Sequence, residues 1–172
     1  MPRRFDHTVP SSLSAATVHA ALTSEKYWAD RLEAVGGPKA VLNDVTVSGD
    51  TADTRTVSVS MTQAIAEELL PGAITSIRPG DLIIHRTESW GSLDAQGAAG
   101  TFEAKVEGAP ASITGTLALR SKGAGSALTA TGQAEVKVPI FGGKIEQAVI
   151  EQVLALIDAE QDFTDTWAPE HL

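Results

Sequence analysis

Cysteine is absent from the 172 residues of this chain. Its absence excludes disulfide bonds, a thiol nucleophile and metal sites built on cysteine. A chain without cysteine suits a reducing compartment, and the N-terminal residues lack the continuous apolar core of a signal peptide. We therefore predict a cytoplasmic protein.

Long apolar runs are also missing, and none approaches the roughly 20 residues that a membrane-spanning helix needs. We expect no integral membrane segment. Basic residues are few, since 13 Lys and Arg stand against 22 Asp and Glu for a net charge of −9. Nucleic acids and anionic membrane surfaces are bound through clustered Lys and Arg, so the composition disfavours both as partners.

Motifs of the common enzyme classes are absent as well. Gly142-Gly143-Lys144 superficially resembles a phosphate-binding loop, but Val138 stands where that loop needs glycine, and Ile145 replaces the Ser or Thr that binds magnesium. The chain has no Gly-x-Ser-x-Gly elbow, no His-Glu-x-x-His motif and no dinucleotide fingerprint. The histidines lack the spacing of metal ligands. We predict no metal, no cofactor and no assignable catalytic residue.

The strongest pattern that is present lies near the C-terminus, between Val138 and Trp167. Apolar residues recur there at intervals of three and four, which places them on one face of a long helix. This apolar stripe consists of Ile145, Ala148, Val149, Val153, Leu156, Ile157, Phe163 and Trp167. A stripe this wide needs a covering surface, and a curved sheet is the simplest one.

Shorter elements are predicted for the rest of the chain. A first strand over residues 3–9 is followed by two short helices that end at Gly36-Gly37-Pro38. From residue 41 onward, apolar and polar residues alternate in about six runs, which indicates antiparallel strands with one dry and one wet face. Residues 63–80 have no clear pattern, and the glycine- and alanine-rich segment 91–100 is predicted to be a mobile turn.

This order of elements resembles the helix-grip fold of the START and Bet v 1-like superfamily, which includes polyketide cyclases, dehydratases and lipid-transport proteins. Within it, the chain is similar to an uncharacterised actinobacterial family of domains of unknown function (DUF2505-like). The resemblance implies an α+β fold, with a curved antiparallel sheet of six to seven strands around the C-terminal helix, as a single domain over residues 1–172. The residues that carry it are Ser11-Ser12-Leu13-Ser14, Tyr27-Trp28, Thr87-Glu88-Ser89-Trp90, residues 138–146 and residues 163–167.

The resemblance also implies a cavity between sheet and helix that accepts a hydrophobic or amphipathic small molecule, lipid-like or polyketide-like. Small residues on the predicted dry face support it, because they leave space: Ala104, Gly115, Ala130, Gly132 and Ala134. Closer packing of the helix would fill that space instead. The predicted lining consists of Ile84, Trp90, Phe102, Ala104, Leu117, Ala130, Gly132, Phe141, Val149, Val153 and Ile157.

Polar residues on the predicted strand 82–90 leave its orientation open. If Arg86 and Glu88 face the cavity, their charges need a partner or a ligand there. If the other face is turned inward, His85 becomes a candidate acid or base. A strand whose polar groups face only solvent is the third interpretation.

Three functions follow from these patterns. The leading hypothesis is a non-enzymatic binder or carrier of a hydrophobic small molecule. The second is an enzyme of the cyclase or dehydratase type that uses His85, Arg86 or Glu88 for proton transfer. The third is a module with a filled interior that binds a protein partner through an exposed apolar patch.

Acidic residues crowd the C-terminal half of the predicted long helix, where the helix dipole disfavours negative charge. They are Asp158, Glu160, Asp162 and Asp165. We expect Arg3 and Arg4 of the first strand to lie near them.

Overall fold

A computed structural model describes residues 2–70, 72–76, 79–140 and 142–172. Seven strands, four α-helices and one short 3-10 helix follow one another along this part of the chain. Their bounds are β1 (Arg3–Ser11), α1 (Ala15–Leu22), α2 (Glu25–Val35), β2 (Val41–Ser48), β3 (Thr56–Ile65), η1 (Glu67–Leu69), α3 (Gly72–Thr75), β4 (Leu82–Trp90), β5 (Gly97–Val106), β6 (Ala111–Lys122), β7 (Gly125–Val136) and α4 (Gly142–His171).

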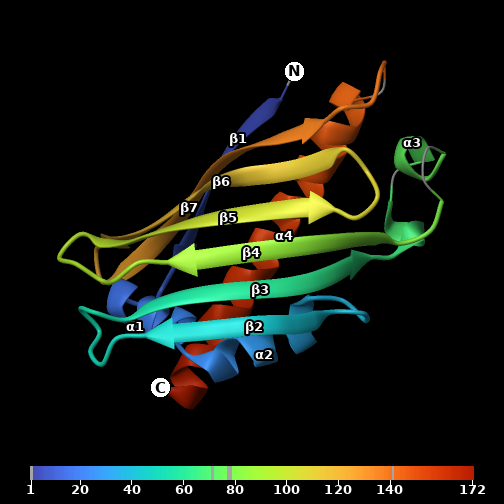
Figure 1. Cartoon of the computed structure of the whole chain (residues 1–172). Helices are drawn as coiled ribbons and strands as arrows, with labels where there is room; N and C mark the ends of the chain where they lie inside the picture. Colours follow the sequence, from blue (N-terminus) through green and yellow to red (C-terminus); the bar gives the residue numbers. More distant parts are fainter. Residues whose placement is uncertain (1, 71, 77–78, 141) are drawn as a thin grey trace.

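All seven strands form one antiparallel sheet in the order β1-β7-β6-β5-β4-β3-β2. The chain leaves β1 at one edge and reaches β2 at the other edge through α1 and α2. Helix α4 crosses one face of the sheet diagonally, and its C-terminal end meets α2 (Figure 1). The predicted α+β helix-grip architecture is thereby confirmed, including the two short helices after the first strand.

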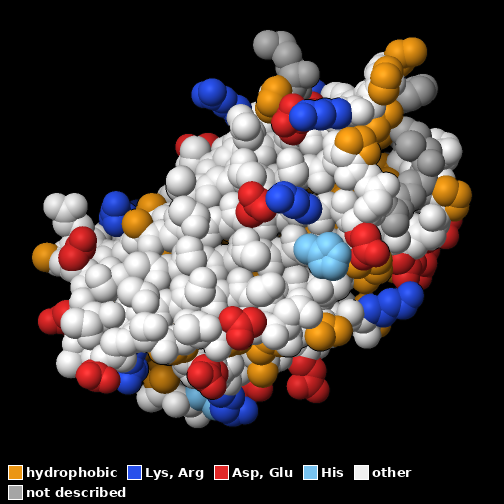
Figure 2. Space-filling model, viewed as in Figure 1, with side chains coloured by type: hydrophobic (Ala, Val, Ile, Leu, Met, Phe, Trp, Pro, Cys, Tyr) orange, Lys and Arg blue, Asp and Glu red, His pale blue; other side chains and the backbone are white. Residues whose placement is uncertain are grey.

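The two faces of the sheet differ as the alternation predicts. The inner face carries buried apolar residues toward α4, among them Val57, Val59 and Met61 of β3. The face turned to the viewer in Figure 2 is covered mostly by uncharged polar side chains and backbone. One row of hydroxyl groups crosses five strands in register: Thr131, Thr116, Thr101, Ser89 and Ser58.

Helix α2 is fastened to α4 by hydrogen bonds from buried rings. The Tyr27 hydroxyl lies 2.6 Å from Thr164 Oγ1, and Trp167 Nε1 donates to Asp30 Oδ2 at 2.8 Å. Trp28 is almost fully buried, and its Nε1 donates to the Leu22 carbonyl at 2.7 Å. Each ring thus buries a large apolar surface while its polar atom keeps a partner.

The mobile turn predicted over residues 91–100 is wrong for its second half. Strand β5 already begins at Gly97, where the φ of +133° and a close approach to the Leu119 carbonyl require glycine. Asp94 Oδ1 accepts hydrogen bonds from the backbone N–H groups of Gln96 and Gly97, which orders the turn before it. Glycine and alanine here mark a tight turn and a closely paired strand.

The acidic residues of α4 have partners other than the predicted arginines. His7 Nε2 lies 2.7 Å from Asp158 Oδ1, and Ser11 Oγ donates to Asp165 Oδ1. Arg3 instead reaches the opposite end of α4, beside Gly143, and Arg4 is exposed. The first strand does run along these carboxylates, but the prediction that Arg3 and Arg4 lie near them is wrong, because the register brings His7 and Ser11 to the helix.

Two glycines face each other where the sheet is most tightly covered. Gly115 of β6 pairs with Gly132 of β7, and the rings of Phe102 and Phe5 lie against them with centroids 6.3 Å apart. A Cβ atom on Gly115 would lie 2.7 Å from Phe102 Cε1 and 2.4 Å from the Thr131 carbonyl oxygen. The space predicted above these glycines is therefore occupied by two phenyl rings.

Gly115→Ala is expected to lower the free energy of unfolding by about 1–3 kcal/mol, because the added methyl group displaces Phe102 or the β6–β7 pairing. Urea denaturation followed by circular dichroism measures the change. Gly72→Ala is the matched control, since no atom lies within 4 Å of its added Cβ. Equal stability of the two variants would contradict this account of the glycine pair.

Candidate functional site

A cavity of about 360 Å³ lies between the inner face of the sheet and α4. Its wall is formed mainly by apolar side chains of β3, β4, β5, β6 and α4, and by residues of the η1–α3 segment. Among the predicted lining residues, the wall includes Ile84, Phe102, Ala104, Leu117, Val149, Val153 and Ile157. This volume lies within the range of about 300–1,000 Å³ that small-molecule sites occupy.

Three residues of the predicted lining have other places, and one more is not described by the structure. Trp90 lines a smaller neighbouring cavity of about 30 Å³. Ala130 is fully buried outside the wall of the larger cavity, and Gly132 is covered by the ring of Phe5. Phe141 lies outside the described residues.

Several further residues of the wall were not in the predicted lining. Leu70 and Ile74 come from the segment whose pattern was unclear, and Gly36 and Gly37 come from the end of α2. Gln63 also lines the cavity. The alternation of Val57, Val59 and Met61 continues to Gln63, so strand periodicity was a usable signal for its inward position.

Strand β4 turns Arg86 and Glu88 toward the interior. Both line the cavity, while His85 is exposed on the outer face, where its Nε2 lies 3.2 Å from Glu107 Oε2. The structure thus selects one of the two orientations that the sequence left open. It places His85 away from the cavity.

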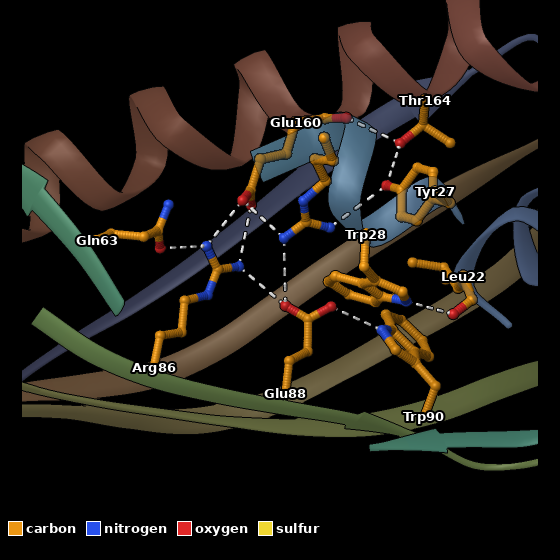
Figure 3. A network of polar contacts seen from close by, with 10 residues as sticks. Leu22, Tyr27, Trp28, Gln63, Arg86, Glu88, Trp90, Glu160 and Thr164 are labelled. Atoms are coloured by element: carbon orange, nitrogen blue, oxygen red, sulfur yellow. Dashed lines mark hydrogen bonds and ion pairs between the residues drawn. The ribbon is translucent and has the colours of Figure 1, made fainter. Parts of the chain in front are cut away.

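Four buried charged side chains meet at one end of the cavity, and we call them the four-charge cluster: Arg31, Arg86, Glu88 and Glu160. Arg86 forms a bidentate pair with Glu160, with Nη1–Oε2 at 2.8 Å and Nη2–Oε1 at 3.0 Å. Arg86 Nη2 also donates to Glu88 Oε1 at 2.9 Å, and Arg31 Nη2 donates to Glu160 Oε2 at 2.6 Å (Figure 3). The cluster joins α2, β4 and α4.

Neighbouring side chains contact further polar atoms of the cluster. Trp90 Nε1 donates to Glu88 Oε2 at 2.9 Å, and Arg31 Nη1 donates to the Tyr27 hydroxyl at 3.3 Å. The Arg31 guanidinium also lies 4.4 Å from the centre of the Trp28 ring, a cation–π contact. Pairing of this kind is what makes charges this deeply buried tolerable.

The electrostatics hold Arg86 and Glu160 in their ionised forms. Burial alone would raise the pKa of Glu160, but Arg31 and Arg86 outweigh it and lower that pKa below its ordinary value. Burial alone would lower the pKa of Arg86, yet Glu160 and Glu88 raise it above its ordinary value. Arg86 and Glu160 are therefore fixed charges and hydrogen-bonding groups near neutral pH, and proton transfer by them is disfavoured.

Arg31 and the buried role of Glu160 were not predicted from the sequence. Glu160 falls three residues after Ile157 and seven before Trp167, so helical spacing places it on the apolar face of α4. Arg31 follows Tyr27 by one helical turn on the buried face of α2. A charged residue on each of two buried helix faces was a signal for a buried ion pair.

Two negative findings apply to the described residues. They contain no group of three or more His, Cys, Asp or Glu side chains that could hold a metal ion. Across the same residues, no helix has the length and hydrophobicity to cross a membrane.

Glu160→Gln is expected to lower the free energy of unfolding by about 3–5 kcal/mol at pH 7, because it leaves two buried guanidinium groups short of one carboxylate. Folding lowers the pKa of Glu160, so its stabilisation is complete above the ordinary Glu pKa of about 4.3. It is lost as pH falls through the lower folded-state pKa. The difference between wild type and variant therefore narrows in acid, which urea denaturation across a pH series measures.

Glu107→Gln is the matched control for that variant. It makes the same chemical change in the exposed pair with His85, which solvent screens. We expect it to leave stability close to that of the wild type at every pH. A comparable loss in both variants would show that burial of the four-charge cluster is not what makes Glu160 important.

Solved structures share this fold at low sequence identity. The aromatase/cyclase Zhui from Streptomyces sp. R1128 superposes with a TM-score of 0.56 at 12% identity, over 99% of this chain and 95% of that chain. A norcoclaurine synthase mutant from Thalictrum flavum gives 0.55 at 17% identity, over 99% and 96%. The protein TTHA0849 from Thermus thermophilus gives 0.57 at 11% identity, over 98% of each chain. These likenesses show the fold alone.

Relatives with clear sequence identity are uncharacterised proteins. Rv0481c of Mycobacterium tuberculosis and Mb0491c of Mycobacterium bovis are each 32% identical to this chain over 169 residues. The match covers 97% of this chain and 97% of each relative. The family described as "Protein of unknown function (DUF2505)" matches residues 6–168. The resemblance expected from the sequence is confirmed, and this chain belongs to the DUF2505 family.

Proposed function

We propose that this protein binds a hydrophobic or amphipathic small molecule in the cavity between the sheet and α4. The observation that carries the proposal is the cavity of about 360 Å³ itself, with its largely apolar wall. A void of this size lined by apolar groups binds apolar molecules, because water finds few hydrogen-bond partners there. The polar groups gathered at the four-charge cluster suit a ligand that has one polar end.

The named structural neighbours are compatible with this proposal. One is an aromatase/cyclase, and another is a norcoclaurine synthase in complex with a transition-state analogue. The described architecture supports the view that residues 1–172 act as one ligand-binding domain, since elements from α2 near one end of the chain to α4 at the other line the cavity. A protein-interaction module with a filled interior is disfavoured by the same cavity.

A cyclase or dehydratase is the second candidate, favoured by the presence of Arg86 and Glu88 in the cavity wall. Its weakness is that the predicted groups are poorly placed to carry a proton, since both Glu88 oxygens already accept hydrogen bonds, from Arg86 Nη2 and Trp90 Nε1. His85 lies on the outer face, and the raised pKa of Arg86 keeps its guanidinium protonated. Binding without chemistry therefore accounts for the site with fewer assumptions.

Ala104→Phe is expected to weaken binding of the neutral fluorophore N-phenyl-1-naphthylamine at least tenfold, because the ring fills part of the cavity. Fluorescence titration of the purified protein measures the affinity. Ala99→Phe is the control, since Ala99 lies on the same strand but on its exposed face. Circular dichroism checks that both variants are folded.

Two results would overturn the proposed function. One is a wild-type protein that gives no saturable increase in fluorescence with this probe. The other is an Ala104→Phe variant that binds the probe as well as the wild type does. Native mass spectrometry of the protein purified from its own host extends the test, since a copurified lipid-like or polyketide-like molecule would identify the ligand.

A further inference from the structure

Gln63 places a hydrogen-bond donor without a partner in the cavity wall. The residue lies on the inner face of β3, is only 6% exposed and lines the cavity. Its Oε1 accepts a hydrogen bond from Arg86 Nη1 at 3.4 Å. Within the described part of the chain, its Nε2 has no hydrogen-bond partner, although buried amide donors are almost always paired.

The neighbouring arginine fixes which way this amide points. A guanidinium group has donors and no acceptor, so it requires the oxygen of Gln63 and not the nitrogen. Figure 3 shows the Gln63 oxygen directed at Arg86 and the nitrogen directed away from it. Both amide protons are consequently available to a molecule in the cavity.

The four-charge cluster determines which acceptor suits these protons. Its two arginines and two glutamates sum to zero charge, and their mutual contacts range from 2.6 to 3.0 Å in four hydrogen bonds. No cation of the cluster is left for an added carboxylate or phosphate. A charged ligand would lose its hydration without gaining a counter-ion, whereas a neutral carbonyl or hydroxyl oxygen needs only a donor.

We propose that Gln63 Nε2 selects the ligand by donating to a neutral acceptor oxygen, a carbonyl or hydroxyl group, on an otherwise apolar molecule. This inference rests on the proposed ligand-binding function and specifies its ligand class. Gln63 acts as a specificity-determining residue. Arg86 acts as a positioning residue, because it holds the amide with its donors toward the cavity.

Three probes with one naphthalene skeleton test the inference by displacement of bound N-phenyl-1-naphthylamine. They are 2-acetylnaphthalene, which carries a carbonyl, 2-isopropenylnaphthalene, which has nearly the same shape without an acceptor, and 2-naphthoate, which is charged. The wild-type protein is expected to bind the ketone about five- to tenfold more tightly than the isopropenyl compound, as one net hydrogen bond allows. We expect 2-naphthoate to bind at least tenfold more weakly than the ketone.

Two substitutions of Gln63 assign that preference to its amide. Gln63→Glu keeps an oxygen for Arg86 and removes the donors, and Gln63→Leu removes both. Each is expected to bring the ratio of the two neutral probes to about one while both probes still bind. Gln147→Leu is the matched control, because Gln147 is exposed on α4 and lies outside the cavity wall. It is expected to retain the preference.

The possible failures are distinguishable. If both neutral probes displace the fluorophore equally well from the wild type, or if the preference survives in both Gln63 variants, this inference is overturned while the binding function stands. If 2-naphthoate binds most tightly, the ligand is an anion and the inference is equally overturned. If no probe displaces the fluorophore and the fluorophore itself does not bind, the proposed function fails as well.

Discussion

The bidentate pair between Arg86 and Glu160 connects the sheet to the helix that it encloses. Hydrophobic contact between an apolar helix and an apolar sheet favours dense packing but has no preferred direction. Arg31 also binds Glu160, and Glu88 also binds Arg86, so the ion pairs link α2, β4 and α4 to one another. An ion pair is directional where hydrophobic contact is not, and the position of the cavity beside the cluster follows from that geometry.

Periodicity predicted the fold because the helical period and the strand period are both carried by apolar residues that pack in the core. The stripe from Ile145 to Trp167 recurs at helical spacing, and the alternation around Val57 and Val59 fixes one dry face. The cavity was less accessible to such reasoning. Small residues on a dry face leave space beside the sheet, but the sequence does not show what fills it. Two phenyl rings fill the space beside Gly115 and Gly132, whereas the cavity lies beside Ala104.

The polar part of the site shows a different limit of sequence reasoning. Arg86 and Glu88 were visible on one strand, yet their partners are residues 31 and 160, which lie far away along the chain in helices that a pattern cannot place relative to each other. Glu160 appeared among several acidic residues of one helix segment, and only its spacing from Ile157 distinguished it from the exposed Asp158 and Asp162. Contacts of this kind depend on tertiary packing, which local spacing does not contain.

The pairing of the first strand with the last has a consequence for biosynthesis. Strand β1 hydrogen-bonds to β7, so residues 3–11 have no sheet partner until residues 125–136 have left the ribosome. A topology with such long-range contacts folds slowly, and until closure the nascent chain carries an unpaired strand edge that invites aggregation. Helix α4, which covers the inner face of the sheet, is synthesised after all seven strands. Strand β1 therefore waits longer for its first sheet partner during synthesis than any other strand does.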